Sequence, residues 1–247
     1  MKYIFLSVLF IFLLNCKQNK TEQLSAEFIV NKSIEVSRAD KVGISTIDFD
    51  FRDKHYYAKR HQGNFLLMRL FAEANKDSIY DMLSNDGFVR QVNKEKFFLE
   101  DSMKAKYSAS VNSVHYFSVL PYGLNNEAVI KTRLDDILIN NETYYTIQIT
   151  FQQEGGGEDY EDVFLYWINS ETFKIDYLAY SYNEDDGKGM RFREAYNERY
   201  VNGIRFVDYN NYKPNETSVT LLELPKLFEK GRLKLLSKIE LENVSVN

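Results

Sequence analysis

The sequence predicts an α+β fold. We expect one strongly curved antiparallel sheet, a half-barrel of about ten strands, with an N-terminal helix and a second helix inserted midway on its concave face. Aromatic residues make up 15% of the chain and proline occurs only 3 times, a composition that suits pleated strands. Short stretches alternate apolar and polar residues, and turn sequences separate them. Two other stretches have the spacing of one helical face.

The first helix is expected over residues 22–38, with Ser25 or Thr21 as its N-cap. Apolar side chains recur there at helical spacing, so that one side of the helix faces the sheet. These side chains are Leu24, Phe28, Val30 and Ile34.

The early strands begin after Gly43, where apolar residues start to alternate with polar ones, as Ile47, Phe49 and Phe51 do. The pair Asp86-Gly87 between two such stretches is a strong hairpin signal. Further strands are expected over 65–72, 78–83 and 88–92.

The second helix is expected over residues 100–120, with Asp101 or Ser102 as its N-cap. Pro121 and Gly123 follow its end, as is typical after a helix. Its apolar side chains again recur at the spacing of one helical face: Met103, Tyr107, Val111 and Val114.

After a short helical turn over 125–130, the rest of the chain is predicted to form strands joined by hairpins, and Asn202-Gly203 is the clearest turn signal. Consecutive hairpins imply antiparallel pairing. A sheet of about ten strands has to curl. The expected strands are 133–139, 143–152, 163–169, 174–182, 190–200, 204–212 and 235–244.

The N-terminus has the features of an exported lipoprotein. Lys2 precedes an apolar run over residues 3–14. At about a dozen residues this run is too short to span a bilayer but has the length of a secretory signal. It ends in Leu-Leu-Asn-Cys, which resembles a bacterial lipobox except that Asn15 replaces the usual Gly, Ala or Ser. The resemblance implies that Cys16 receives a lipid and becomes the first residue of the mature chain.

We therefore expect a lipoprotein signal peptide over 1–15, a lipidated polar tether over 16–24 and a single domain over 25–247. The residue after the cysteine is Lys17 rather than the aspartate that retains Gram-negative lipoproteins at the inner membrane. This favours an anchor in the outer membrane, facing the periplasm. An uncleaved anchor or an ordinary signal peptide, with Cys16 unmodified, is the alternative.

Charge and residue counts exclude several classes of function. The net charge is −5, and without residues 1–15, whose only charge is Lys2, it is −6. Such a chain, without a basic block, is a poor nucleic-acid binder. Because Cys16 is the only cysteine, the mature chain has neither disulfides nor a cysteine-based zinc site. His55, His61 and His115 form no metal-binding motif, and we expect no metal and no cofactor.

A broad apolar surface is the most informative feature of the sequence. Residues 163–168, VFLYWI, are apolar on both faces of their strand. If the helices cover the whole surface it is a core, and if they cover only part of it the rest is a cavity for an acyl chain. The candidate ligand-binding residues are Phe49, Phe51, Met68, Leu70, Met103, Tyr107, Val111, Trp167 and Tyr180.

Polar stretches give weaker signals. Residues 154–162 hold five carboxylates around three glycines, which is typical of a solvated loop but also suits a cation or a partner. Residues 183–189 are expected to form a solvated hairpin tip. Residues 191–196 alternate charged and aromatic side chains, which favours a solvent-facing ladder over ligand binding. Catalysis would need His115 within hydrogen-bond reach of the loop carboxylates.

Seven stretches carry a family resemblance: IDFDFRDKHY (47–56), NDGFVRQVN (85–93), NSVHYFSVLPYGLNNEAV (112–129), TFQQEGGGEDYEDVFLYWIN (150–169), IDYLAYSY (175–182), MRFREAYNERYVNGIRFVDYNNY (190–212) and LKLLSKIEL (233–241). Through them the chain is similar to a family of uncharacterised bacterial exported lipoproteins, a similarity that implies no particular activity. The order of elements resembles the LolA/LolB lipoprotein carriers, which implies a helical lid over a hydrophobic hollow.

Together these observations predict a membrane-anchored periplasmic protein, not an enzyme, that binds a lipid, an acyl chain or a lipoprotein anchor in the hollow of a half-barrel. One alternative is a non-catalytic envelope interaction or assembly module with a solid core that acts through its acidic loops. Another is an enzyme that uses His115 and the loop carboxylates.

Overall fold

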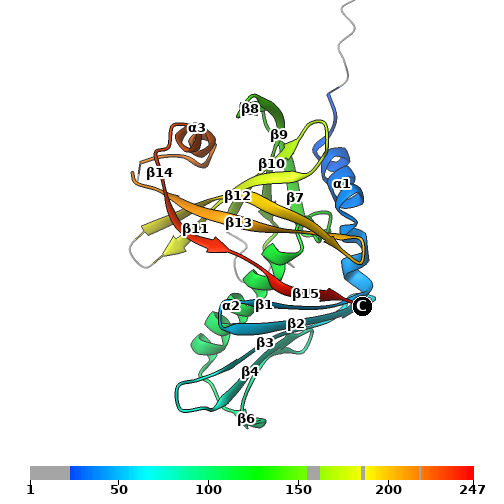
Figure 1. The fold of residues 1–247 in the computed structure, drawn as a ribbon, viewed down its shortest axis with the longest axis vertical. Coiled ribbons are helices and arrows are strands. Elements are labelled where there is room, and N and C mark those ends of the chain that lie inside the picture. The colour runs from blue at the N-terminus through cyan, green and yellow to red at the C-terminus, as the bar shows by residue number, and fades with distance from the viewer. Residues whose placement is uncertain (1–22, 155–161, 185–186, 217) are drawn as a thin grey trace, which may run out of the picture.

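The structure is a computed structural model that describes residues 23–154, 162–184, 187–216 and 218–247. Two antiparallel sheets account for most of these residues, and a few helices pack on them (Figure 1). The predicted α+β class is confirmed. The number of strands differs from the prediction. The described residues contain fifteen strands in two sheets, whereas the sequence predicted about ten in one.

The first sheet has seven strands, six of which follow one another along the chain. The sequence did not predict its second strand, Lys54–His61, because Lys, His and Arg side chains obscure its alternation. The inward side of that strand is buried nonetheless. The order of the sheet is β15 (Glu242–Val246), β1 (Thr46–Phe51), β2 (Lys54–His61), β3 (Asn64–Ala72), β4 (Ser78–Ser84), β5 (Gly87–Val92) and β6 (Glu95–Phe97).

The second sheet has eight strands. Its order is β14 (Leu233–Ile239), β13 (Ile204–Pro214), β12 (Gly187–Val201), β11 (Ile175–Glu184), β10 (Val163–Asn169), β9 (Glu142–Phe151) and β7 (Val129–Arg133), while β8 (Ile137–Ile139) also pairs with β9.

Two expectations near the start of this sheet are wrong. Residues 121–128 form turns and β7 begins at Val129, so there is no helical turn over 125–130. The expected strand 133–139 is interrupted after Arg133, whose guanidinium binds the carboxylate of Asp136 at 2.7 Å. The chain leaves the ladder after this point, and β8 begins at Ile137.

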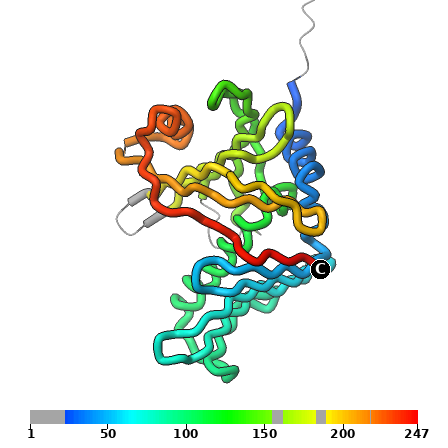
Figure 2. The backbone as a smooth tube through the Cα atoms, in the orientation of Figure 1, coloured from blue at the N-terminus to red at the C-terminus, as the bar shows by residue number. Residues whose placement is uncertain are grey.

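The C-terminal segment joins the two sheets. Figure 2 shows it passing from the second sheet to the first, where it ends beside β1. The sequence predicted one strand over 235–244, but the chain forms β14 in one sheet and β15 in the other. The break lies at Leu241, which is buried and whose backbone N–H donates to the Asp208 carboxylate at 2.9 Å.

Three α-helices and two short 3-10 helices lie in the described part of the chain. Helix α1 (Ala26–Ser37) begins after Ser25, whose hydroxyl accepts from the Phe28 N–H, as predicted. Helix α2 (Asp101–Ser118) begins after Glu100, so neither Asp101 nor Ser102 is its N-cap. The others are α3 (Leu224–Glu229), η1 (Ala39–Ile44) and η2 (Leu221–Glu223).

The second sheet is buried on both faces. Along β10, Phe164, Tyr166 and Ile168 belong to the core that α1 and the end of α2 cover. Leu165 and Trp167 belong to a separate core on the other face, which α3 covers. This explains why the sequence of β10 is apolar throughout.

A third core lies where the two sheets meet. It combines Ile47, Phe49 and Tyr56 of the first sheet with Ile204 and Phe206 of the second. The two sheets therefore share buried apolar residues, and α2 runs along both of them.

A candidate ligand cavity between the inserted helix and the second sheet

Helix α2 is attached to the fold by few deeply buried side chains. Of its 18 residues, only Val111, His115 and Ser118 are buried, and the others are half-buried or exposed. Its contacts with the first sheet are with β3, β4 and β5, and its C-terminal turn reaches the second sheet (Figure 1). Its apolar residues still pack into the cores of both sheets, Val111 on the first sheet and Tyr116 and Phe117 on the second.

Polar contacts hold the middle of α2 on the first sheet. Asp81 on β4 is fully buried and binds Arg69 and Arg90, each at 2.6 Å. The pKa of Arg90 is raised, mainly by its hydrogen bond to Asp81. From this triad, Arg69 donates to the Ser110 hydroxyl at 2.7 Å, and the Arg90 guanidinium lies 3.8 Å from the ring centroid of Tyr107.

His115 is a packed residue. Its ring lies edge-on to the rings of Phe49 and Tyr56, and its Nε2 donates to the Met68 carbonyl at 3.0 Å. Burial lowers the pKa of His115 to about 3, so the imidazole is neutral. Among the described residues it has no carboxylate partner, and the acid–base pair that catalysis would need is not formed there.

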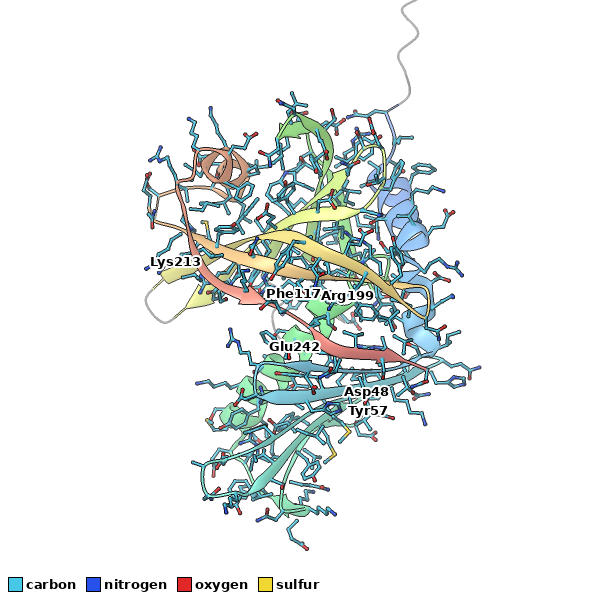
Figure 3. All side chains as sticks on the ribbon, in the orientation of Figure 1. Asp48, Tyr57, Phe117, Arg199, Lys213 and Glu242 are labelled. Carbon is cyan, nitrogen blue, oxygen red and sulfur yellow. The ribbon has the colours of Figure 1, made fainter. Side chains whose placement is uncertain are left out.

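The C-terminal end of α2 contacts the second sheet through aromatic residues. The hydroxyl groups of Tyr116 and Tyr166 are 2.7 Å apart and hydrogen-bonded. Phe117 packs against Tyr180 and Phe164, with ring centroids 5.2 Å and 6.3 Å away. Figure 3 labels Phe117, which lies at the level where the two sheets meet.

A cavity of about 70 Å³ lies between this end of α2 and the second sheet. Only one of its described lining residues is charged, and the others are apolar side chains, two serines and one tyrosine. Phe51 comes from β1, and the remaining residues come from α2, β12, β13 and the C-terminal segment. The full lining is Phe51, Ser113, Val114, Phe117, Ser118, Arg193, Val207, Tyr209, Ile239 and Leu241.

The charged lining residue is Arg193 on β12. It is only 7% exposed, which corrects the expectation that residues 191–196 form a solvent-facing ladder. Its guanidinium lies 3.8 Å from the ring centroid of Phe117, and its Nη2 donates to the Tyr180 hydroxyl at 2.8 Å. The sequence signal for this position was a basic residue within an aromatic strand, and burial could not be inferred from it.

The structure separates the predicted ligand-binding residues into several groups. Phe51 lines the cavity, and Tyr180 adjoins it through Phe117 and Arg193. Phe49 lies in the core between the sheets, and Trp167 lies on the opposite face of the second sheet. Five others lie along β3 and α2: Met68, Leu70, Met103, Tyr107 and Val111.

In the described part of the chain, the polar stretches add no second site. Most of the acidic stretch 154–162 and part of the turn 183–189 lie outside the described residues. A polar cleft of about 420 Å³ elsewhere holds Glu142, Asp176 and Glu198. Lys174 and Arg205 pair with Glu198, and burial raises the pKa of Asp176. In the described part of the chain, no group of three or more His, Cys, Asp or Glu residues could hold a metal ion.

Comparison with protein families identifies a match over nearly the whole chain. Residues 2–241 match the model of a family of unknown function, DUF6503. The chain belongs to DUF6503. The prediction that it is a member of an uncharacterised family is therefore confirmed, and no curated protein matches the sequence.

Solved structures similar to this DUF6503 chain are distant in sequence. They include a LolA superfamily protein from Nitrosomonas europaea, with 11% identity, a TM-score of 0.47, and 91% of this chain and 92% of that chain covered. A putative outer membrane lipoprotein-sorting protein domain from Vibrio parahaemolyticus has 9% identity and a TM-score of 0.37, with 81% and 99% covered. The Mycobacterium tuberculosis lipoprotein LppX has 8% identity and a TM-score of 0.28, with 66% and 90% covered.

No helix in the described ranges of this DUF6503 chain is both long enough and apolar enough to cross a membrane.

Proposed function

We propose that this protein binds a hydrophobic ligand, such as a lipid, an acyl chain or a lipoprotein anchor, between α2 and the second sheet, and that α2 acts as a lid. The observation that carries the proposal is the apolar cavity beneath the C-terminal end of α2. On this proposal the two sheets act together as an open half-barrel whose hollow holds the ligand. The protein is a carrier or binder and not an enzyme.

The volume of the cavity requires the lid to move. One ordered water needs roughly 10–15 Å³ of such volume, so 70 Å³ holds only a few water-sized groups. Pockets that enclose a whole organic ligand measure roughly 300–1,000 Å³. On this proposal the structure is the closed state, and an acyl chain enters when the C-terminal end of α2 leaves the second sheet.

The lid has the contacts that such a movement needs. The middle of α2 stays attached to the first sheet through the Asp81 triad and Ser110. Its C-terminal turn meets the second sheet through one hydroxyl pair, Tyr116 with Tyr166, and through aromatic packing. Burial of an acyl chain contributes about 0.8 kcal/mol per CH₂ group and offsets the loss of those contacts.

The membrane anchor is the second part of the proposal. Cys16 would carry a diacylglycerol group, and the polar residues after it would connect the fold to the outer membrane on its periplasmic side. Since stable anchoring requires more than one acyl chain, a diacylglycerol group is sufficient where a single chain would not be. A ligand bound beneath α2 would then be exchanged close to a lipid surface.

A solid core with function on the surface is the second candidate, and the small volume of the cavity favours it. The protein would then be a non-catalytic envelope interaction or assembly module. The two candidates differ in whether α2 ever admits an apolar molecule.

Native mass spectrometry of the purified chain, followed by organic extraction, tests the proposal. We expect a bound species of lipid mass, or uptake of added fatty acid. The variant Val114→Phe places a ring in the cavity and is expected to abolish uptake, whereas Asn112→Phe, on the exposed side of the same helix, keeps it. A chain that stays free of ligand under all these conditions has a solid core, and the second candidate then holds.

A further inference from the structure

Arg193 is a cation enclosed by aromatic rings. Its guanidinium lies 3.8 Å from the ring centroid of Phe117, 5.1 Å from that of Tyr180 and 5.9 Å from that of Tyr209. Because only 7% of its surface is exposed, Arg193 is less hydrated than an arginine at the protein surface. Cation–π contacts compensate for part of that loss but supply no counter-ion.

The hydrogen-bonding capacity of Arg193 is largely unused. Nη2 donates to the Tyr180 hydroxyl, while Nε and Nη1 are buried and have no partner. Its cross-strand neighbour Asn211 also has a buried amide oxygen without a partner, but a neutral amide does not balance a charge. Burying a guanidinium in this way is costly unless something pairs with it.

Three other buried arginines of the described chain have carboxylate partners. Arg69 and Arg90 share Asp81, and Arg205 binds Glu198 at 2.7 Å. Arg193 has no such partner among the described residues, although Glu194 follows it directly in the sequence. The carboxylate of Glu194 instead accepts from Asn210 and Tyr212.

Arg193 also lines the cavity, which distinguishes it from Arg60. Arg60 is buried as well, and its Nη1 has no partner, but it faces the ring of Tyr122 and does not line the cavity. At Arg193 the unpaired donors and the space for a ligand therefore occur together.

From this combination we infer that Arg193 receives the anionic head group of a single-chain amphiphile, a fatty carboxylate, whose apolar chain lies in the cavity beneath α2. This inference rests on the proposed function and specifies its ligand. A carboxylate fits because it brings one negative charge, and Arg193 is the only charged residue in the described lining. A phosphate group with two charges would keep one of them unbalanced in an apolar site.

Photo-crosslinking of the full-length chain in phosphatidylcholine nanodiscs tests the inference. The probes are palmitate and hexadecanol, each with a diazirine on the alkyl chain, and each is competed with its unlabelled form. Since a hydrogen bond between two charged groups is stronger than one to a neutral hydroxyl, we expect palmitate to bind at least about tenfold more tightly than hexadecanol. Labelling is expected on residues 113–118 and on β13.

Three variants test whether the preference for palmitate depends on Arg193. Arg193→Gln is expected to abolish the preference for palmitate while hexadecanol binds as before. Arg193→Lys, which keeps the charge, is expected to retain part of the preference. Arg60→Gln removes a buried and unpaired charge that does not line the cavity, and it is expected to leave the preference unchanged.

The possible outcomes separate the inference from the proposed function. Equal binding of the two probes by the wild-type chain overturns the inference but keeps the proposed function. A palmitate preference that persists in Arg193→Gln overturns the inference as well. If neither probe labels the cavity, the proposed function fails and the inference fails with it. Should Arg193→Gln not fold, the wild-type ratio and Arg193→Lys still decide the question.

Discussion

Buried arginines occur in two settings in this protein. Arg69 and Arg90 share the carboxylate of Asp81, and the resulting triad positions α2 through Ser110 and Tyr107. Arg193 contacts aromatic rings and one hydroxyl group, and it has no carboxylate partner among the described residues. The paired arginines therefore have a structural role, whereas Nε and Nη1 of Arg193 have no partner.

Removing the carboxylate of Asp81 tests the structural role of the paired arginines. In Asp81→Asn two buried guanidinium groups lose their counter-ion, and we expect the free energy of unfolding to fall by about 3–5 kcal/mol. Urea denaturation measures this change. Asp101→Asn is the control, because its carboxylate pairs with Lys104 at the exposed start of α2 and its loss is expected to have little effect. A small loss for Asp81→Asn would show that the triad does not hold the sheet and α2 together.

His115 predicts a pH dependence of stability. Burial lowers its pKa from 6.5 to about 3. Between these two pH values the unfolded chain therefore binds a proton that the folded chain does not. The contribution of His115 to the free energy of unfolding is fully present above about pH 6.5 and decreases as the pH falls. Between pH 7.5 and pH 5 we expect a loss of about 2 kcal/mol from this residue.

The measurement compares wild type with His115→Gln by urea denaturation at the two pH values. The variant is expected to lose about 2 kcal/mol less than wild type on acidification. His61→Gln, at an exposed position, is expected to behave as wild type does. Equal losses in wild type and His115→Gln would mean that the buried imidazole does not resist protonation.

Helix α2 is attached to the two sheets by different kinds of contact. Charged groups and His115 hold it on the first sheet. Its C-terminal turn meets the second sheet through the Tyr116–Tyr166 pair and aromatic packing around the cavity. The sequence predicted this helix and its span, because the apolar side chains from Met103 to Val114 recur at the spacing of one helical face. The sheet that each half of the helix contacts depends on residues far away in the chain.

The contact of α2 with the second sheet can be tested at Tyr116. In Tyr116→Phe the closed lid keeps the fully buried hydroxyl of Tyr166 without its partner, which favours lid opening. We expect uptake of a fluorescent fatty acid to become about tenfold faster in stopped-flow measurements, as a change of about 1.4 kcal/mol implies. Amide hydrogen exchange over residues 113–118 should accelerate in parallel.

The control for this substitution is Tyr57→Phe. Tyr57 lies on β2 and alternates with the buried Tyr56 and Ala58, so its ring is on the outer face of the first sheet. We expect its loss to change neither uptake nor exchange. If Tyr116→Phe also leaves both rates unchanged, the C-terminal turn of α2 is not the part of the lid that opens.

The whole molecule has features that local patterns do not contain. Hairpin signals such as Asn202-Gly203 correctly predicted antiparallel pairing, since β12 and β13 pair there. They could not predict that the chain after β14 would leave one sheet and complete the other, because the partners β1 and β15 are about 200 residues apart. Local patterns could not predict the candidate site for the same reason, because Phe51, Val114 and Arg193 lie in three distant parts of the sequence.

The last prediction concerns how the whole molecule is held at the membrane. Between Cys16 and the first turn of α1 the chain has about nine residues, which span at most roughly 30 Å when extended. If Cys16 carries a lipid, the fold lies close to the bilayer, and a ligand can pass between membrane and cavity over a short distance. We expect Cys16→Ser, expressed as the full chain in bacteria, to lose incorporation of labelled palmitate and to keep the mass of the precursor.

A matched control moves the thiol within the same segment. The double variant Ser7→Cys with Cys16→Ser keeps one cysteine, but outside the Leu-Leu-Asn-Cys pattern, and it should remain unlabelled. If wild type itself is cleaved, released and unlabelled, the segment is an ordinary signal peptide. If wild type keeps the precursor mass in the membrane fraction, the segment is an uncleaved anchor. In either case Cys16 carries no lipid, and the hydrophobic ligand would reach α2 without a lipidated tether.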